Sequence, residues 1–248
     1  MRIDVCMRVD DLQPEVISAT SAVVFDVLRA TSTIVTALAN GCHGVIPVTD
    51  TEDAIARAHQ KRHEGLETLL GGERGGRKLT GFDTGNSPLE YSGDVIAGKF
   101  LILTTTNGTR TIEACKTAAN VYMGSLLNAR AVARRLYNEK SDVTLVCAGT
   151  KGRFSLEDAV AAGLVMLELK VLASKDASKV KLQMTDAATA VALLAAGYEK
   201  GIGQCLYDSA HGQRLLQLGF DEDLVWCGKA NKFSVVPVLD RHKGLVTL

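Results

Sequence analysis

Short apolar runs alternate with amphipathic stretches over the first 150 residues of the chain. The apolar runs are rich in β-branched residues and are bounded by glycine or polar residues, as is typical of strands. Strands are therefore predicted at residues 3–7, 22–27, 44–48, 68–70, 100–104, 120–123 and 143–147. Between these runs, apolar residues recur at helical spacing, and helices are predicted at residues 33–40, 51–63, 109–118 and 128–138. This alternation favours an α/β fold, in which helices cover both faces of a largely parallel or mixed sheet.

The pattern changes after residue 155, where long alanine-rich helical stretches replace the alternation. Helices are predicted at residues 156–173, 185–199 and 208–218, and short strands at 234–239 and 245–248. Ser155 and Asp158 have the spacing of a helix capping box. Because no linker, repeat or low-complexity segment interrupts the chain, we expect one domain over residues 1–248, with an α/β half to about residue 150 and a helix-rich half from about residue 151.

The charge balance argues against two classes of partner. The chain has 28 Lys and Arg and 28 Asp and Glu, so its formal net charge is zero. Proteins that bind nucleic acid or acidic membranes usually have a basic excess, so we expect neither partner. The N-terminus has no apolar signal core, and the later apolar stretches are too short or too charged to span a bilayer, which predicts a cytoplasmic protein. Whether the chain forms a homo-oligomer stays open.

The first candidate site lies where an apolar run ends on Asp26, with Arg29 three residues later. Three hydroxyl residues, Thr31, Ser32 and Thr33, then open a helical pattern. In α/β proteins, ligands bind at the carboxyl ends of strands. A carboxylate there can hold a divalent metal, and an arginine can hold a phosphate by two hydrogen bonds. A capped helix with surface charges is the alternative.

A second candidate is the glycine-rich segment 71–76, in which Glu73 and Arg74 stand between two pairs of glycines. Glycine allows a backbone to approach a ligand closely. The segment continues into a long polar stretch that includes Asn86, and such a stretch is uncommon in a compact domain unless it lines a site. A flexible hairpin turn is the alternative.

A third candidate follows the predicted strand at 100–104, where Thr106, Asn107, Gly108, Thr109 and Arg110 open a helix. Hydroxyls, backbone N–H groups and an arginine could together bind an anion. The segment is not a Walker A loop, because the chain has no Gly-Lys-Ser/Thr sequence. An Asn-Gly turn with a helix cap is equally consistent with these residues.

Two further segments have the same placement between a strand and a helix. One contains Ser125 and Asn128, and the other contains Thr150 and Arg153. On a parallel sheet all five segments would converge on one edge. Together they are therefore stronger evidence for a ligand site than any one segment alone.

Two known phosphatase patterns fit less well. Cys147 and Arg153 have the Cys-x5-Arg spacing of cysteine phosphatases, but Cys147 ends an apolar run and no histidine precedes it. The aspartyl-phosphate pattern requires Asp-x-Asp after a strand, whereas Val27 and Leu28 follow Asp26. The six cysteines form no CxxC or CxxH pair, so no zinc site is expected.

Taken together, these motifs resemble those of the 2-phosphosulfolactate phosphatase family. The matching segments span nearly the whole chain, at residues 25–33, 71–76, 81–88, 104–110, 124–128, 147–150, 154–158, 208–212 and 235–238. The resemblance implies a three-layer α/β/α fold and a magnesium-dependent hydrolase. The implied reaction converts 2-phospho-3-sulfolactate to 3-sulfolactate and phosphate, in coenzyme M biosynthesis or a related sulfonate route.

The implied substrate carries a phosphate, a carboxylate and a sulfonate, so its site needs local positive charge. We expect Arg29, Arg74, Arg110 and Arg153 to supply that charge. Magnesium prefers carboxylate oxygens and water, so Asp26 and Glu73 are the predicted metal ligands. Asp83 and Asp158 are the next candidates, although capping is the favoured role of Asp158. Asp26 as a nucleophile is a less favoured alternative.

The predicted catalytic residues are Asp26, Arg29, Glu73 and Arg74. The predicted substrate-binding residues are Thr31, Ser32, Thr33, Asn86, Thr106, Asn107, Gly108, Thr109, Arg110, Ser125, Asn128 and Thr150. Two other functions stay open: a cysteine-dependent phosphatase that uses Cys147 and Arg153, and a non-catalytic protein that binds small anions. Phosphate release, measured with a chelator and after thiol alkylation, would separate them.

Overall fold

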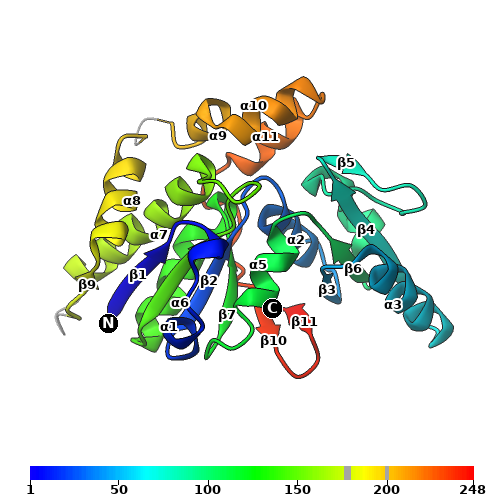
Figure 1. Cartoon of the computed structure of the whole chain (residues 1–248), viewed down its shortest axis with the longest axis horizontal. Helices are drawn as coiled ribbons and strands as arrows, with labels where there is room; N and C mark the ends of the chain where they lie inside the picture. The colour runs from blue at the N-terminus through cyan, green and yellow to red at the C-terminus, as the bar shows by residue number, and fades with distance from the viewer. Residues whose placement is uncertain (176–179, 199–200) are drawn as a thin grey trace.

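A computed structural model describes residues 1–175, 180–198 and 201–248 (Figure 1). Its strands are β1 (Arg2–Cys6), β2 (Ser21–Phe25), β3 (Gly44–Val48), β4 (Thr68–Arg74), β5 (Arg77–Lys78), β6 (Phe100–Thr104), β7 (Val121–Gly124), β8 (Val143–Cys147), β9 (Gln183–Met184), β10 (Val238–Asp240) and β11 (Leu245–Thr247). Its α-helices are α1 (Pro14–Ser18), α2 (Ala30–Ala39), α3 (Thr51–His63), α4 (Gly93–Ile96), α5 (Gly108–Ala114), α6 (Ala129–Glu139), α7 (Leu156–Lys175), α8 (Asp186–Ala196), α9 (Gln204–Asp208), α10 (Ala210–Gln217) and α11 (Asp221–Cys227). Three short 3-10 turns are η1 (Val9–Asp11), η2 (Pro88–Glu90) and η3 (Leu126–Asn128).

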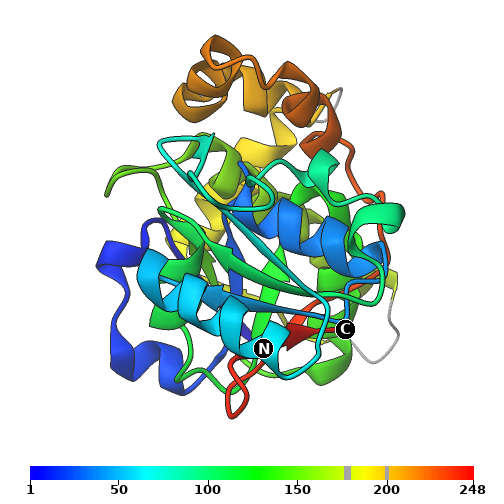
Figure 2. The same ribbon diagram turned by 90° about the vertical axis from the view of Figure 1, so that its right-hand side faces the viewer.

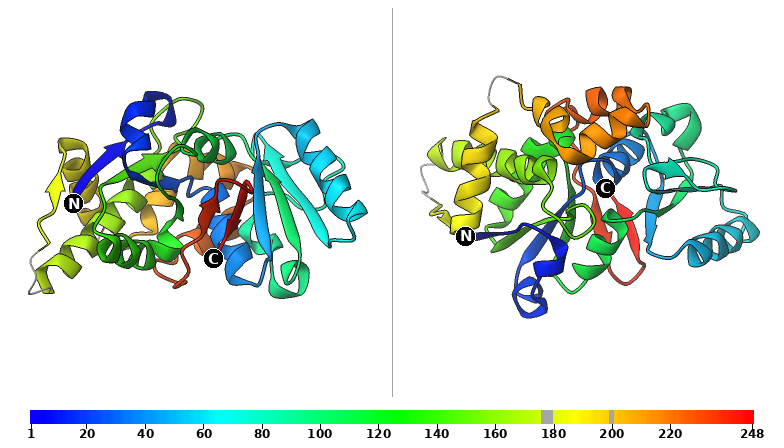
Figure 3. Two further views of the ribbon diagram at one scale, coloured as in Figure 1. Left: turned by 90° about the horizontal axis from the view of Figure 1, so that it is seen from below. Right: turned by 45° about the horizontal axis from the view of Figure 1, so that its top comes forward.

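In the described residues the strands form one eleven-stranded sheet in the order β5-β4-β6-β3-β11-β10-β7-β2-β8-β1-β9. Strands β4, β6 and β3 are parallel to one another, and so are β7, β2, β8, β1 and β9. The hairpin of β10 and β11, which comes from the end of the chain, joins these two blocks by antiparallel pairing (Figures 1 and 3). The expectation of a mixed, largely parallel sheet is confirmed.

Helices cover both faces of the sheet, as β2 illustrates. All five of its residues are buried, as expected for a strand packed on both sides. Val23 and Phe25 belong to an apolar cluster with α6 and α7, whereas Ala22 and Val24 belong to another with α1, α2 and α5. Because successive side chains of a strand point to opposite faces, this division gives the three-layer α/β/α arrangement that was expected.

The smaller elements complete the layers. A third apolar cluster packs α3 against β3, β4 and β6. Helices α9, α10 and α11 lie together beyond one end of the sheet, at the top of the molecule in Figures 1 and 2. None of the described helices is long and apolar enough to cross a membrane.

The predicted elements at 44–48, 51–63, 100–104 and 143–147 have the bounds that the structure shows. The strand predicted at 68–70 was too short, because β4 continues to Arg74, and the helix predicted from residue 33 begins at Ala30. Residues 234–237 were wrongly predicted as strand, since β10 begins at Val238. The helix predicted at 208–218 is interrupted at Ser209, which caps α10, and residue 199 of another predicted helix lies outside the described residues.

Candidate active site

Four strands end at a cavity of about 50 Å³, which we term the inner cavity. Asp26 follows β2, Glu73 stands near the end of β4, Thr106 follows β6 and Thr150 follows β8. Helix α10 adds His211 to its lining. Four of the five segments predicted to converge on one edge therefore border one cavity.

Asp26 is held in place by the first turn of α2. Its backbone N–H donates to Thr31 Oγ1 at 3.1 Å, and its carbonyl accepts the N–H of Thr31 at 2.9 Å. Gly108 allows α5 to approach closely, because a Cβ at that position would lie 2.7 Å from Asp26 Oδ2. Burial, followed by the charge of Glu73, raises the pKa of Asp26 from 3.8 to about 7, although a hydrogen bond from the Ala30 N–H opposes the rise.

Glu73 is fixed by hydrogen bonds to both of its carboxylate oxygens. Oε1 accepts the N–H of Thr106 at 2.8 Å and the Thr106 hydroxyl at 2.9 Å. Oε2 accepts the N–H of Gly76 at 2.7 Å, in a turn where Gly76 has a φ of 90°. A glycine suits this left-handed backbone, so the turn between β4 and β5 aims an N–H group at the carboxylate.

The oxygen atoms of this cavity fit a hard divalent cation. Asp26 and Glu73 bring two carboxylates into one buried space, and Asn86 adds a side-chain Oδ1 that is buried without a hydrogen-bond partner. In the described part of the chain, no group of three or more His, Cys, Asp or Glu side chains is arranged to hold a metal. Magnesium is often bound by only one or two carboxylates, with water and substrate phosphate completing its shell. The residues present therefore suit magnesium.

Arg29 borders the inner cavity, but its guanidinium is engaged within the protein. It donates to Asp223 Oδ2 and to the Gly76 carbonyl, each at 2.6 Å, and it lies 4.2 Å from the ring centre of Phe220. Asp223 also accepts the Ser87 hydroxyl at 2.5 Å. Arg29 thus ties α11 and the β4–β5 turn to the start of α2, which is a positioning role.

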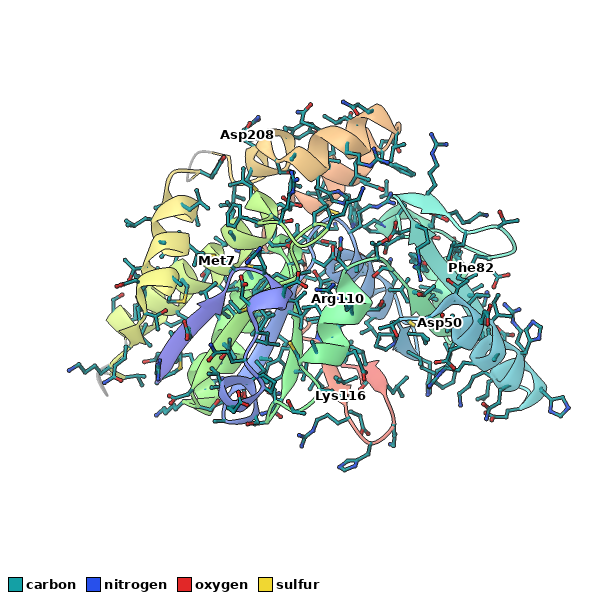
Figure 4. All side chains as sticks on the ribbon, viewed as in Figure 1. Met7, Asp50, Phe82, Arg110, Lys116 and Asp208 are labelled. Carbon is teal, nitrogen blue, oxygen red and sulfur yellow. The ribbon has the colours of Figure 1, made fainter. Side chains whose placement is uncertain are left out.

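Two of the other three arginines predicted to hold the substrate, Arg74 and Arg110, lie outside the lining of the inner cavity. Arg74 donates to the Glu73 carbonyl and to the Thr104 hydroxyl, and it does not line the inner cavity. Arg110 is about half exposed on α5, where Figure 4 labels it, and pairs with Asp10 at 2.5 Å. The structure thus places neither guanidinium in the lining of the cavity.

Four of the predicted hydroxyl residues are buried and bind the protein's own loops, whereas Thr106 and Thr150 line the inner cavity. Thr31, Ser32 and Thr33 donate to the carbonyls of Asp26, Val27 and Asn86. Thr109 likewise donates to the Thr105 carbonyl at 2.9 Å, one turn before it in the chain. These four side chains do not line the inner cavity, and their hydrogen bonds hold the backbone around it in place.

Ser125 and Asn128 lie apart from the cavity, in the turn after β7. Asn128 Oδ1 accepts the N–H of Ser125 at 2.9 Å, and its amide donates to the carbonyls of Met123 and Val235, each at 3.1 Å. Both residues are fully buried. Asn107, in contrast, lines the inner cavity at the start of α5.

The two reserve carboxylates have structural contacts. Asp83 pairs with Arg62 and accepts the N–H of Leu70 at 2.7 Å, outside the inner cavity. Asp158 accepts the N–H groups of Val27 at 2.8 Å and Gly149 at 3.1 Å. It thus joins the loops after β2 and β8, instead of completing the capping box predicted with Ser155.

Several lining residues were assigned no role from the sequence. His211, Lys151 and Arg214 border the inner cavity, and His211 stands in the segment 208–212, one of the segments that carry the family resemblance. Burial and the charge of Arg29 lower the pKa of His211 below its ordinary 6.5, although a hydrogen bond to the Leu28 carbonyl opposes the shift. The imidazole is therefore neutral at neutral pH.

Cys147 lies at the end of β8 and is fully buried. Burial, followed by the charge of Asp158, raises its pKa well above the ordinary 9.0 of a thiol. It does not line the inner cavity. A nucleophilic cysteine needs an accessible thiolate, and this environment disfavours one.

A family model described as 2-phosphosulpholactate phosphatase matches residues 6–242. The chain is 41% identical over 237 residues to a Clostridium acetobutylicum protein named probable 2-phosphosulfolactate phosphatase. The aligned region covers 96% of this chain and 97% of that protein. A protein of the same name from Thermotoga petrophila is 45% identical over 219 residues, 88% of each chain. A third, from Clostridium perfringens, is 40% identical over 236 residues, 95% of this chain and 92% of that protein.

Proposed function

The chain belongs to the 2-phosphosulfolactate phosphatase family, and we propose that it hydrolyses 2-phospho-3-sulfolactate to 3-sulfolactate and inorganic phosphate in a magnesium-dependent reaction. As a member of this family the chain is a phosphoric monoester hydrolase. We further propose that the reaction takes place in the cytoplasm, as a step of coenzyme M biosynthesis or of a related sulfonate route.

The observation that carries the proposal is the pair of carboxylates in the inner cavity. Asp26 and Glu73 face the same small space, and the neighbouring cation Arg29 is already paired with Asp223. Two anionic groups in a buried space repel each other unless a proton or a cation lies between them. Magnesium held by these carboxylates would remove that repulsion and polarise the phosphoryl oxygens of the substrate.

Hydrolysis adds the oxygen of water to phosphorus, breaks the bond between phosphorus and the ester oxygen, and leaves a proton on the sulfolactate oxygen. In the proposed reaction the phosphate group enters the inner cavity, where Asn107 and Thr106 lie beside it. His211 is the group suited to accept a proton from the attacking water, because its imidazole is neutral and one ring N–H is held by the Leu28 carbonyl. Arg29 orders the loops around these groups.

Two substitutions test the proposal. Asp26→Asn and Glu73→Gln keep the shapes of the side chains and remove their charges, so phosphate release should fall by about a hundredfold or more. Asp94→Asn serves as the matched control, because Asp94 is exposed on α4 and lines neither this cavity nor the one beside it. Its activity should equal that of the parent. Retention of a third or more of the activity by either cavity variant would contradict the assignment.

The same assay separates the rival functions. A non-catalytic anion-binding protein would release no phosphate from any ester, while a cysteine-dependent phosphatase would lose activity after thiol alkylation. The buried position and raised pKa of Cys147 favour neither alkylation nor nucleophilic attack at that sulfur.

A further inference from the structure

A second, larger cavity of about 370 Å³ adjoins the inner one, and we term it the outer cavity. Thr150, Lys151, His211 and Arg214 line both, so the two spaces meet at these residues. Arg153 lines only the outer cavity. A small molecule whose head fills the inner cavity can therefore extend its remainder into the outer one.

Three cations of the outer cavity have no partner among the residues that the structure describes. Lys151, Arg153 and Arg214 are exposed, and their side chains form no ion pair or hydrogen bond with any described residue. Arg29 and Arg110, in contrast, are paired with Asp223 and Asp10. Unpaired cations around one hollow are available to an anionic ligand.

The rest of the lining is compatible with an anion. Glu157 is the carboxylate that borders the outer cavity, and it is 2% exposed. Burial raises the pKa of Glu157, which favours its neutral form. Phe154, at 50% exposure, supplies an apolar wall on which the carbon atoms of a ligand can lie.

We propose that the outer cavity is the subsite for the two acid groups of the substrate, with Arg153 binding the sulfonate and Lys151 and Arg214 binding the carboxylate beside the ester. This inference rests on the proposed function and assigns substrate selectivity to residues other than Arg29, Arg74 and Arg110. The position of Arg153, away from the inner cavity, makes it the cation that meets only the far end of the ligand.

The test compares three phosphate esters: 2-phospho-3-sulfolactate, 2-phospholactate without the sulfonate, and ethyl phosphate without either acid group. Arg153→Gln should lower kcat/KM about tenfold for phosphosulfolactate, mainly by raising KM. For the other two esters the same substitution should lower kcat/KM much less. Arg214→Gln should lower kcat/KM for both lactate esters. Arg134→Gln is the matched control, because Arg134 is also exposed and unpaired but lines neither cavity.

Direct binding of 3-sulfolactate, measured by calorimetry, keeps this test apart from the proposed function. The parent and Arg134→Gln should bind it, and Arg153→Gln should bind it about tenfold more weakly. This measurement decides the subsite even if the parent hydrolyses none of the esters. Equal binding by Arg153→Gln and the parent, no binding by the parent, or an equal loss for all three esters would overturn the inference.

Discussion

Replacing Asp26 by Asn should stabilise the metal-free protein at alkaline pH while removing its activity. The carboxyl is 6% exposed, and burial together with the charge of Glu73 raises its pKa from 3.8 to about 7. An asparagine of nearly the same shape carries no charge at any pH. The substitution therefore removes the unfavourable ionisation and leaves the surrounding backbone contacts in place.

The direction of the effect follows from the pKa difference. Below about pH 4 the carboxyl is protonated in both the folded and the unfolded chain. Between about pH 4 and 7 the unfolded chain loses the proton and the folded chain keeps it, so the free energy of unfolding falls as pH rises. The difference of about 3 units, at 1.36 kcal/mol per unit, gives a total cost of about 4 kcal/mol above pH 7.

The Asn amide group must find a new acceptor in the same buried space, which costs about 2 kcal/mol. At pH 8 a net gain of about 2 kcal/mol remains, or about 4–8 °C in Tm for a chain of this length. At pH 5 only about 1.6 kcal/mol of the ionisation cost has developed, so the two effects nearly cancel. Thermal unfolding in EDTA at both pH values measures this difference, with Asp94→Asn as the exposed control.

Adding magnesium in the same thermal-unfolding experiment gives an independent test. At pH 8 it should raise the Tm of the parent and of Asp94→Asn but have little effect on Asp26→Asn, because a bound cation offsets the buried charge only where that charge exists. If Asp26→Asn is less stable than the parent at both pH values, or if its Tm difference is the same at pH 5 and pH 8, the carboxyl is not an uncompensated buried charge and the reasoning fails.

Other predictions concern the predicted site residues whose side chains are bonded within the protein. Arg29→Lys should lower Tm by several degrees, because an ammonium group cannot bond Asp223 and the Gly76 carbonyl while lying on an aromatic ring; an unchanged Tm would refute this role. Arg110→Lys should keep kcat/KM within about twofold, because the exposed pair with Asp10 contributes little; a selective loss of activity would return Arg110 to the site. Asn128→Ala should cost about 2 kcal/mol in urea unfolding while kcat changes little, because its buried amide makes three backbone contacts; full stability with lost activity would contradict this.

Local patterns predicted the strands that lead to Asp26 and Glu73, although the strand at 68–70 was predicted too short to include Glu73 itself. β-branched runs bounded by polar residues define β3, β6 and β8, and the Thr-rich start of α2 follows Asp26 directly. The pairing of β10 and β11 between the two parallel blocks was not predictable in this way, because it depends on which distant strands the end of the chain meets. The two-residue strands β5 and β9 are too short to show a period.

The ion-pair partners of the arginines could not be predicted from the sequence. Arg29 finds its partner at Asp223, far along the chain, and Arg110 finds Asp10. Spacing within a motif cannot show that a guanidinium is already paired by a residue from another element. His211 and Arg214 line the cavity because α10 packs beyond the carboxyl ends of the strands. The sequence gives no signal for where α10 packs.

The central claim is that phosphate transfer takes place at Asp26 and Glu73 with magnesium and does not use a thiolate. Phosphate release from 2-phospho-3-sulfolactate by the parent and by Cys147→Ser, each in EDTA and then in excess Mg²⁺, tests it most directly. Both proteins should be inactive in EDTA and regain similar activity with Mg²⁺, since a buried thiol contributes only to packing. A parent enzyme that is fully active in EDTA, beside a folded Cys147→Ser variant that is inactive under both conditions, would contradict the claim.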